Sequence, residues 1–191
     1  MVRFKGKLYL LPTPIDEHGL ESIPAEAIRI MHSLEHFIVE RARTSRRYIS
    51  STKPPRKIET LQIEEMPEDV NNMKLMEAQM QPLLEGKDMG MLSEAGLPAI
   101  ADPGSKYVAI AHRLGIRVVP ITGPSSIMLA LMASGLEGQR FTFHGYLSAK
   151  KEDLANEIQN IERRADKDNA TQIWIETPYR NRQIMEAVEK Y

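Results

Sequence analysis

Short apolar runs alternate with amphipathic segments along the first 120 residues of the chain. Four runs have the length of buried strands, and Gly, Pro or polar residues bound them: Leu8–Pro12, His36–Glu40, Asp88–Ser93 and Ile116–Ile121. A weaker run, residues 58–67, predicts a short edge strand. Helical spacing between the runs makes the pattern typical of a mostly parallel sheet that helices cover on both faces.

Three segments between these runs repeat apolar residues every three or four positions, as amphipathic helices do. The first, which Ser22 and Pro24 precede, has its apolar face at Ala27, Ile30, Met31 and Leu34. The second starts at Glu68 and ends at Gly86, and its face consists of Met73, Met76, Met80, Leu83 and Leu84. The third has Val108, Ala111 and Leu114, and the basic residues and glycine in 112–115 are usual helix end signals.

The pattern changes after residue 121. Ile127–Ala133 is apolar all round, which predicts a buried helix between two lobes. A strand at 141–147, a helix around 154–161, a strand at 171–176 and a last helix around 184–191 follow. We therefore expect an N-terminal α/β domain of residues 1–121 and a smaller C-terminal α/β domain of residues 122–191.

Composition limits the class of protein. The chain has 191 residues, of which 42% are hydrophobic and 27% charged, enough for one large or two small globular domains. The absence of cysteine excludes disulfides and Cys-ligated metals. The longest apolar stretch, IMLALMA, is too short to span a membrane, and we expect a cytoplasmic protein. The net charge of −1 means that a nucleic-acid partner must be bound by a local patch.

Two loops of small residues follow apolar runs and expose their backbone. They are Met91–Asp102, with the sequence MLSEAGLPAIAD, and Ile121–Ser126, with the sequence ITGPSS. Loops at the carboxyl edge of a parallel sheet usually line a ligand crevice. From spacing alone, the first loop is as well explained by a rigid connector, and the second by a helix start that Ser125 or Ser126 caps.

Charged residues near these loops admit more than one interpretation. Glu40 and Glu94 stand at strand ends, where a carboxylate can act as a general base, cap a helix or bind a backbone amide. Arg43, Arg46 and Arg47 at helical spacing form either an RNA-binding patch or a solvated helix face. The five histidines are not paired at metal-ligand spacing, so no metal site is expected, and the hydrolase, Walker and dinucleotide-binding motifs are absent.

Several motifs occur together in one order. They are LYLLPTPI at 8–15, SEAGLPAIADPGS at 93–105, VVPITGPSS at 118–126, ALMASGL at 130–136 and FTFHGYL at 141–147. In this order and approximate spacing they resemble the tetrapyrrole (corrin/porphyrin) methylase superfamily, and within it the ribosomal RNA small-subunit methyltransferase I family. The segment ETPYR at 176–180 resembles that family's ESPHR, so the resemblance covers most of the chain.

The resemblance implies two α/β lobes of the tetrapyrrole methylase type with a cofactor cleft between them, a homodimer, and S-adenosylmethionine as cofactor. The founding members methylate corrin and porphyrin precursors, and the ribosomal branch methylates a cytidine ribose 2′-hydroxyl in small-subunit rRNA. Carried over by position, the cofactor-binding residues are Pro12, Thr13, Ser93, Glu94, Ala95, Gly96, Pro98, Ala99, Ile100, Gly123, Pro124, Ser125, Ser126, Glu176 and Thr177. Glu94 and Glu40 are the candidate catalytic carboxylates, and Gly96→Val is expected to fill the ligand's space without disturbing the fold.

The chain also departs from the family pattern. PTPIDE replaces PTPIGN, so Asp16 and Glu17 stand where Gly and Asn are usual, and ERART replaces EDTR. Leu97 replaces a Thr in the cofactor loop. Two acids near the substrate would repel a phosphate backbone or select another substrate. Relatives continue into further strands, so the C-terminal lobe is either incomplete or completed by a dimer partner.

The first hypothesis is therefore an S-adenosylmethionine-dependent methyltransferase that acts on small-subunit ribosomal RNA, in which Arg43, Arg46 and Arg47 bind RNA. The second is a methyltransferase of a tetrapyrrole or another small molecule, which Asp16 and Glu17 favour. The third is a non-catalytic cofactor- or RNA-binding module, which the altered EDTR segment and the short second lobe favour.

Overall fold

The chain forms two compact units, Met1–Ser125 and Ser126–Tyr191, in a computed structural model that describes residues 4–16 and 18–191. Glu17, one of the two acids in PTPIDE, lies outside the described residues. The division falls four residues after the boundary expected from the sequence. Each unit has its own hydrophobic core.

A five-stranded parallel sheet in the order β3-β2-β4-β1-β5 forms the centre of the first unit. Its strands are β1 (Lys7–Leu11), β2 (His36–Val39), β3 (Gln62–Glu65), β4 (Met89–Leu92) and β5 (Arg117–Pro120). The expected mixed α/β class with a parallel N-terminal sheet is confirmed. The weak run at 58–67 is β3, which lies at the edge of the sheet as the sequence predicts.

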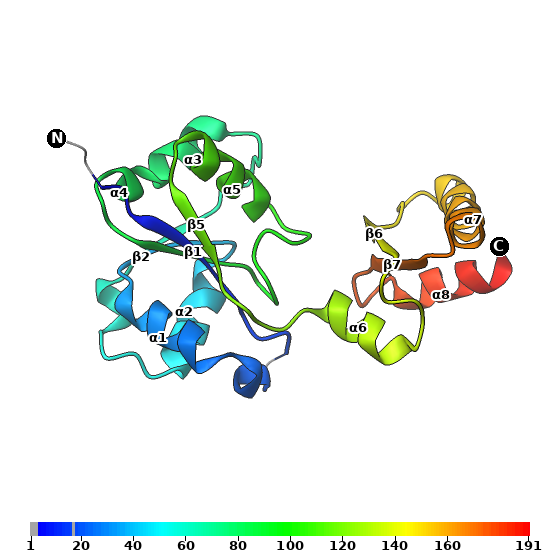
Figure 1. Ribbon diagram of the computed structural model, residues 1–191, viewed down its shortest axis with the longest axis horizontal. Helices are drawn as coiled ribbons and strands as arrows, with labels where there is room; N and C mark the ends of the chain where they lie inside the picture. The colour runs from blue at the N-terminus through cyan, green and yellow to red at the C-terminus, as the bar shows by residue number, and fades with distance from the viewer. Residues whose placement is uncertain (1–3, 17) are drawn as a thin grey trace. The chain divides into compact units, whose positions relative to one another are not determined.

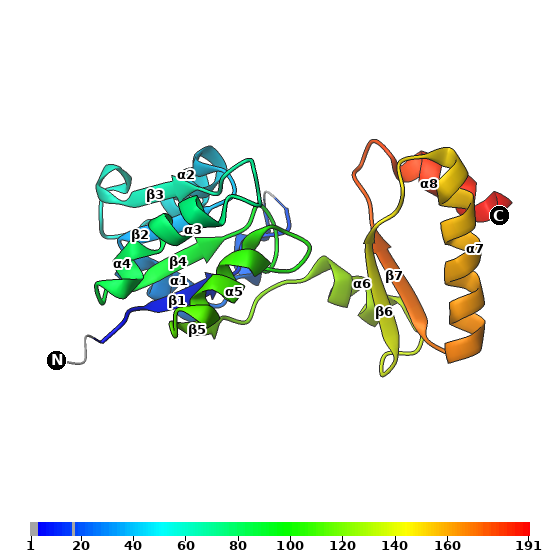
Figure 2. The same ribbon diagram turned by 90° about the horizontal axis from the view of Figure 1, so that it is seen from above.

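Helices cover both faces of this sheet, because alternate strand residues point to opposite sides. α1 (Ala25–Ser33) and α2 (Ala42–Ser51) lie on one face, and α3 (Met73–Gln79), α4 (Gln81–Leu84) and α5 (Gly104–Arg113) lie on the other (Figures 1 and 2). Leu8 and Met91 are buried with α3 to α5, whereas Leu11, Phe37 and Leu92 are buried with α1 and α2. Short 3-10 turns occur at Gly19–Ser22 and Ile58–Thr60.

The helix expected from Glu68 to Gly86 is shorter and divided. It starts at Met73, because the side chain of Asn72 accepts a hydrogen bond from the amide of Leu75 at 3.2 Å and caps it. It breaks at Met80, where Pro82 in the first turn of α4 has no amide hydrogen to continue the helix. The apolar spacing identified the buried face correctly but not these two interruptions.

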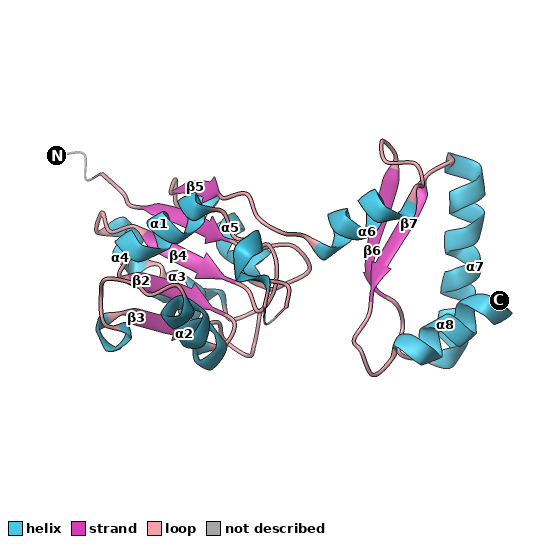
Figure 3. Ribbon diagram, turned by 90° about the horizontal axis from the view of Figure 1, so that it is seen from below, coloured by secondary structure: helices cyan, strands magenta, loops and turns pink. Residues whose placement is uncertain are grey.

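The second unit contains a two-stranded parallel sheet of β6 (Phe141–Tyr146) and β7 (Thr171–Ile175). The helices are α6 (Ser126–Ser134), α7 (Lys151–Asp168) and α8 (Asn181–Lys190) (Figure 3). Leu147, Leu154, Ile158, Ile161 and Ile184 form its core, against which Trp174 packs.

The second unit by itself buries little of α6, and the expected burial of this helix between two lobes stays a prediction. Within this helix only Ile127 is buried, whereas Leu129 is 51% and Met132 is 78% exposed. A helix without a polar face is buried only when other elements surround it, and α6 contacts β7 along one side. No helix in the described ranges is long and apolar enough to cross a bilayer.

Candidate functional site

Four turns gather at the carboxyl edge of the first unit's sheet, since parallel strands all end at the same edge. Pro12 and Thr13 follow β1, Glu40 follows β2, Ser93 follows β4, and Ile121 follows β5. The two loops of small residues singled out in the sequence, 91–102 and 121–126, are thus placed at one edge, as are the candidate carboxylates.

A short antiparallel bridge joins the turn after β1 to the loop after β4. The amide of Thr13 donates to the carbonyl of Gly96 at 2.9 Å, and the amide of Gly96 donates back at 3.1 Å. The hydroxyl of Thr13 also donates to this carbonyl, and Thr13 is only 4% exposed. The pair therefore holds the two turns in a fixed relation.

The turn after β5 packs against the same place. A Cβ on Gly123 would lie 2.1 Å from the Cβ of Pro12, so this position accepts no side chain without a shift of the backbone. A Cβ on Gly96 would lie 3.4 Å from the carbonyl oxygen of Pro124, which is an ordinary contact. Three turns that are distant in sequence thus form one corner.

The expectation that Gly96→Val leaves the fold intact is wrong. Gly96 has a φ of +75°, a conformation that strains a β-branched residue. Because Gly96 also pairs with Thr13 through both its backbone groups, the strain would move the loop itself. A loss of binding in this variant could not be assigned to a filled ligand space.

Asp102 organises the C-terminal half of the loop. Its carboxylate accepts hydrogen bonds from the amides of Ala99, at 2.9 Å, and Gly104, at 2.7 Å, across a segment in which Ala99 and Ala101 have φ values of 69° and 60°. Burial raises the pKa of Asp102 to about 6, the charge of Glu40 adds to this, and the two amide bonds oppose it. The sequence interpretation passed over Asp102, although an Asp two residues before a helix start is a typical turn signal.

The two candidate catalytic carboxylates are linked through the backbone. Glu40 accepts a hydrogen bond from the amide of Glu94 at 2.5 Å, which is the amide-binding alternative that the sequence left open. The carboxylate of Glu94 is exposed and accepts a hydrogen bond from the hydroxyl of Thr44 at 2.5 Å. Glu94 is therefore the more accessible of the two carboxylates, and Glu40 binds its amide.

A cavity of about 300 Å³ opens beside Glu94 in the first unit. Its lining comes from the turn after β1, the following segment, α2 and the start of the β4 loop: Thr13, Pro14, Ile15, Asp16, Leu20, Thr44, Ser45, Arg47, Tyr48, Ser51, Ser93 and Glu94. The hydroxyl of Tyr48 donates to the carbonyl of Pro12 at 3.0 Å, and burial raises its pKa to about 12, so it stays protonated at neutral pH. The sequence interpretation missed Thr44, Tyr48 and Ser51, which only the tertiary fold brings to the site.

The three candidate RNA-binding arginines lie on the solvent side of α2. Arg43, Arg46 and Arg47 are exposed, while Ala42, Ser45 and Ile49 form the buried side of this helix. Arg47 also lines the cavity beside Glu94. A cationic helix face thus borders the candidate site.

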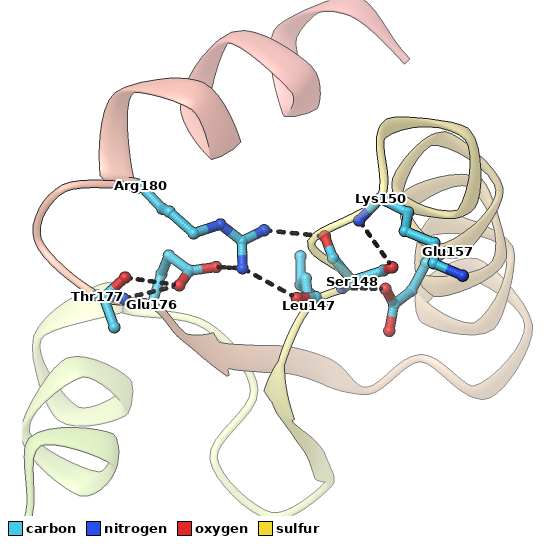
Figure 4. A network of polar contacts seen from close by, with 7 residues as sticks. All are labelled: Leu147, Ser148, Lys150, Glu157, Glu176, Thr177 and Arg180. Atoms are coloured by element: carbon cyan, nitrogen blue, oxygen red, sulfur yellow. Dashed lines mark hydrogen bonds and ion pairs between the residues drawn. The ribbon is translucent and has the colours of Figure 1, made fainter.

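The remaining candidates belong to the second unit, where Ser126 starts α6 and Glu176 and Thr177 follow β7. Glu176 has a side chain 5% exposed, accepts hydrogen bonds from the amide and hydroxyl of Thr177, and forms an ion pair with Arg180 at 3.1 Å (Figure 4). Arg180 also donates to the carbonyls of Leu147 and Ser148, at 3.4 and 2.8 Å. One oxygen of Glu176 thus accepts both hydrogen bonds from Thr177, while the other is buried beside the Arg180 guanidinium and accepts no hydrogen bond from the described residues.

The second unit also contains a larger cavity, of about 450 Å³, between β7, α7 and α8. Ile158, Ile161, Trp174 and Val188 give it a largely apolar lining, and none of the candidate site residues borders it. His144 lies elsewhere in this unit, within 2.7 Å of the side-chain oxygen of Gln172, as a packed strand residue. In the described part of the chain, no three His, Asp or Glu side chains are arranged to hold a metal ion.

Comparison with known sequences gives a consistent result. The model of the family described as Tetrapyrrole (Corrin/Porphyrin) Methylases matches residues 7–191. "Ribosomal RNA small subunit methyltransferase I" of Halalkalibacterium halodurans is 31% identical over 92% of this chain and 57% of its own length. The protein of the same name from Pasteurella multocida is 30% identical over 100% of this chain and 63% of its own. The chain thus spans about three fifths of the length of these relatives.

Solved structures share the fold at low sequence identity. The native uroporphyrin III C-methyltransferase of Thermus thermophilus matches with a TM-score of 0.58 and 16% identity, over 97% of this chain and 76% of that one. A diphthine synthase matches with a TM-score of 0.57 and 16% identity, over 90% of this chain and 64% of that one.

Proposed function

Because the chain belongs to the tetrapyrrole (corrin/porphyrin) methylase family, we propose that it transfers a methyl group from S-adenosylmethionine to small-subunit ribosomal RNA. The acceptor in this proposal is the 2′-hydroxyl of a cytidine. The relatives named ribosomal RNA small subunit methyltransferase I, at 30 to 31% identity, support RNA as the substrate class. The proposal includes a homodimer and a cytoplasmic protein.

The observation that carries the proposal is the corner of three turns at the carboxyl edge of the sheet. Thr13, Gly96 and Gly123 bring small residues and open backbone together where α/β sheets bind ligands. We assign the donor to this corner, with contacts from Pro12, Thr13, 93–100 and 123–126. For Glu176 and Thr177 we propose a supporting role in the second unit, because the carboxylate of Glu176 is already bound.

The proposed chemistry needs positioning and one base. S-adenosylmethionine, when bound, supplies an electrophilic methyl carbon without a metal or a redox centre. A ribose hydroxyl is a weak nucleophile, so the exposed carboxylate of Glu94 accepts its proton. Glu40 binds the amide of Glu94 and fixes the backbone from which this carboxylate extends, while the hydroxyl of Thr44 orients it.

Methyl transfer to ribosomal subunits tests this function. Small subunits from a strain that lacks the protein are incubated with the chain and labelled S-adenosylmethionine, and the rRNA is digested to nucleosides. We expect labelled 2′-O-methylcytidine, and a decrease in kcat of about 10²-fold or more for Glu94→Gln. Glu85→Gln, an exposed carboxylate before β4, is the matched control and is expected to retain wild-type activity. Unlabelled rRNA would contradict the proposal.

One observation favours a second acceptor class. Asp16 is exposed and lines the cavity beside Glu94, where its charge disfavours a phosphate backbone. Label in an added corrin or porphyrin precursor, with none in rRNA, would support a small-molecule methyltransferase. Binding of the donor without transfer to either acceptor would support a non-catalytic module.

A further inference from the structure

We propose that the cavity between the β1 turn, α2 and the β4 loop holds a single nucleoside of the acceptor, with its ribose directed toward Glu94. The inference rests on the proposed function, since it names the part of the RNA that the same site receives. Four independent properties of the cavity carry it: its chemical lining, its size, its charge and its position against the donor corner.

Hydroxyl groups dominate the polar lining. They come from Thr13, Thr44, Ser45, Tyr48, Ser51 and Ser93. Those of Thr13, Thr44, Tyr48, Ser51 and Ser93 already donate their hydrogens to protein oxygens. Each hydroxyl oxygen can still accept a hydrogen bond, which suits the donor groups of ribose hydroxyls and of a base amino group. Tyr48 and Arg47 add the aromatic ring and the planar guanidinium on which unstacked RNA bases commonly stack.

The size of the cavity limits its occupant. A volume of about 300 Å³ is at the lower end of the range for small-molecule sites. It suits one base with its ribose, whereas four linked pyrrole rings or several stacked nucleotides need a wider site. Enzymes that modify a nucleotide commonly take it out of its stack into such a pocket.

The charge of the lining favours a nucleoside inside the cavity and its flanking phosphates outside it. The lining contains two carboxylates, those of Asp16 and Glu94, and one guanidinium, that of Arg47, so its net negative charge disfavours a phosphate group. Arg43 and Arg46 lie outside the lining on the exposed side of the same helix. A nucleoside in the cavity would place its flanking phosphates toward these cations.

The cavity also adjoins the donor corner. Thr13 lines the cavity and forms the bridge with Gly96, so one residue belongs to both places. Glu94 lines the cavity and lies two residues before Gly96 in the donor loop. A nucleoside in the cavity would therefore have its ribose hydroxyl near both Glu94 and the loop 93–100, to which we assign the methyl donor.

A filling substitution with a matched control tests the inference. Ser51→Tyr introduces a ring at the last residue of α2, where Ser51 lines the cavity, and Ser50→Tyr introduces the same ring one residue earlier, outside the lining. Circular dichroism checks that both variants are folded.

We expect Ser51→Tyr to lower kcat/KM for small subunits by at least about tenfold, mainly through KM, and to leave the Kd of S-adenosylmethionine unchanged. Ser50→Tyr should stay within about twofold of wild type. Wild-type kcat/KM in a folded Ser51→Tyr variant would overturn the inference and leave the proposed function standing.

A second measurement does not depend on methyl transfer. Cytidine added to the ¹⁵N-labelled chain should shift the amide signals of Thr44, Tyr48 and Ser51, and these shifts should be lost in Ser51→Tyr. Shifts at these amides in a chain that transfers no methyl group would support the cavity while the proposed function fails. Shifts elsewhere, or none at millimolar cytidine, would overturn the inference.

Discussion

Gly123 is required by close packing rather than by its backbone conformation. A methyl group at this position would lie 2.1 Å from Pro12, so Gly123→Ala must displace the turn after β5 or the turn after β1. We expect a loss of about 1–3 kcal/mol in the free energy of unfolding, as is usual for overpacked sites. Urea denaturation followed by circular dichroism measures the loss.

Gly138→Ala is the control for this substitution, because no atom lies within 4 Å of the added Cβ. It should change the unfolding free energy by less than about 0.5 kcal/mol. Equal stability of the two variants would show that the turns do not pack as described.

Asp102 makes part of the stability depend on pH. Folding raises its pKa from 3.8 to about 6, so the folded chain binds more protons than the unfolded chain between these values. Its contribution is therefore greatest below about pH 4 and is lost as the pH rises to about 6. Asp102→Asn stays uncharged and lacks this dependence.

Urea denaturation between pH 4 and 7 compares the two proteins. Wild type should lose stability relative to Asp102→Asn as the pH rises, and the difference should level off above about pH 6. A constant difference between the two curves would contradict the buried, amide-bound carboxylate.

The α2 helix presents cations at the carboxyl edge, and we expect these to bind phosphates. Replacement of Arg43, Arg46 and Arg47 by Ala should weaken RNA binding and lower the slope of log K against log salt by about one for each phosphate that is no longer neutralised. The control removes Lys87, Arg113 and Arg117, three exposed cations at the amino edge of the sheet. Filter binding at several salt concentrations measures the RNA affinity and its salt dependence for both triple variants. Equal slopes in the two triple variants would show that the α2 arginines form a solvated helix face and do not bind RNA.

The segment between β7 and α8 depends on a buried ion pair. Arg180→Ala leaves the carboxylate of Glu176 buried without its cation and removes two bonds to the loop before α7, which should cost about 3–5 kcal/mol. Trp174, the only tryptophan in the chain, lies in this unit and reports its unfolding by fluorescence.

Arg182→Ala is the matched control at the start of the same helix. Its ion pair with Glu186 is largely exposed, so its loss should cost less than about 1 kcal/mol. Replacing both buried partners, by Glu176→Gln with Arg180→Met, should recover part of the stability lost in Arg180→Ala. A loss of stability in Arg180→Ala no larger than that in Arg182→Ala would mean that the contacts of Arg180 with Glu176, Leu147 and Ser148 do not stabilise the second unit.

The sequence predicted the presence of helices and strands better than the residues at which they begin and end. Buried strands and helix faces follow from apolar spacing alone, so the parallel sheet and its order of elements could be expected. The break at Met80 and the start at Met73 depend on Pro82 and Asn72, which act locally within an otherwise continuous pattern. The exposure of α6 could not be read from its composition, because burial depends on what surrounds a helix.

At the scale of the whole chain, the loops of the donor corner could be predicted, but the cavity beside them could not. Gly and Pro residues in 91–102 and 121–126 identify the two loops from the sequence. A parallel sheet then places both loops at its carboxyl edge. Thr44, Tyr48 and Ser51 have no motif that distinguishes them from other polar helix residues. Only the packing of α2 against the β1 turn makes them neighbours of Glu94.

The most direct measurement is amide chemical-shift mapping of the chain with S-adenosylmethionine. Binding at the corner of three turns should shift the signals of Ser93–Ile100 and of Gly123–Ser125, and leave the amino-edge residues around Asp88 and Gly115 unchanged. A spectrum that does not respond to the donor, or changes confined to the apolar cavity of the second unit, would contradict the account.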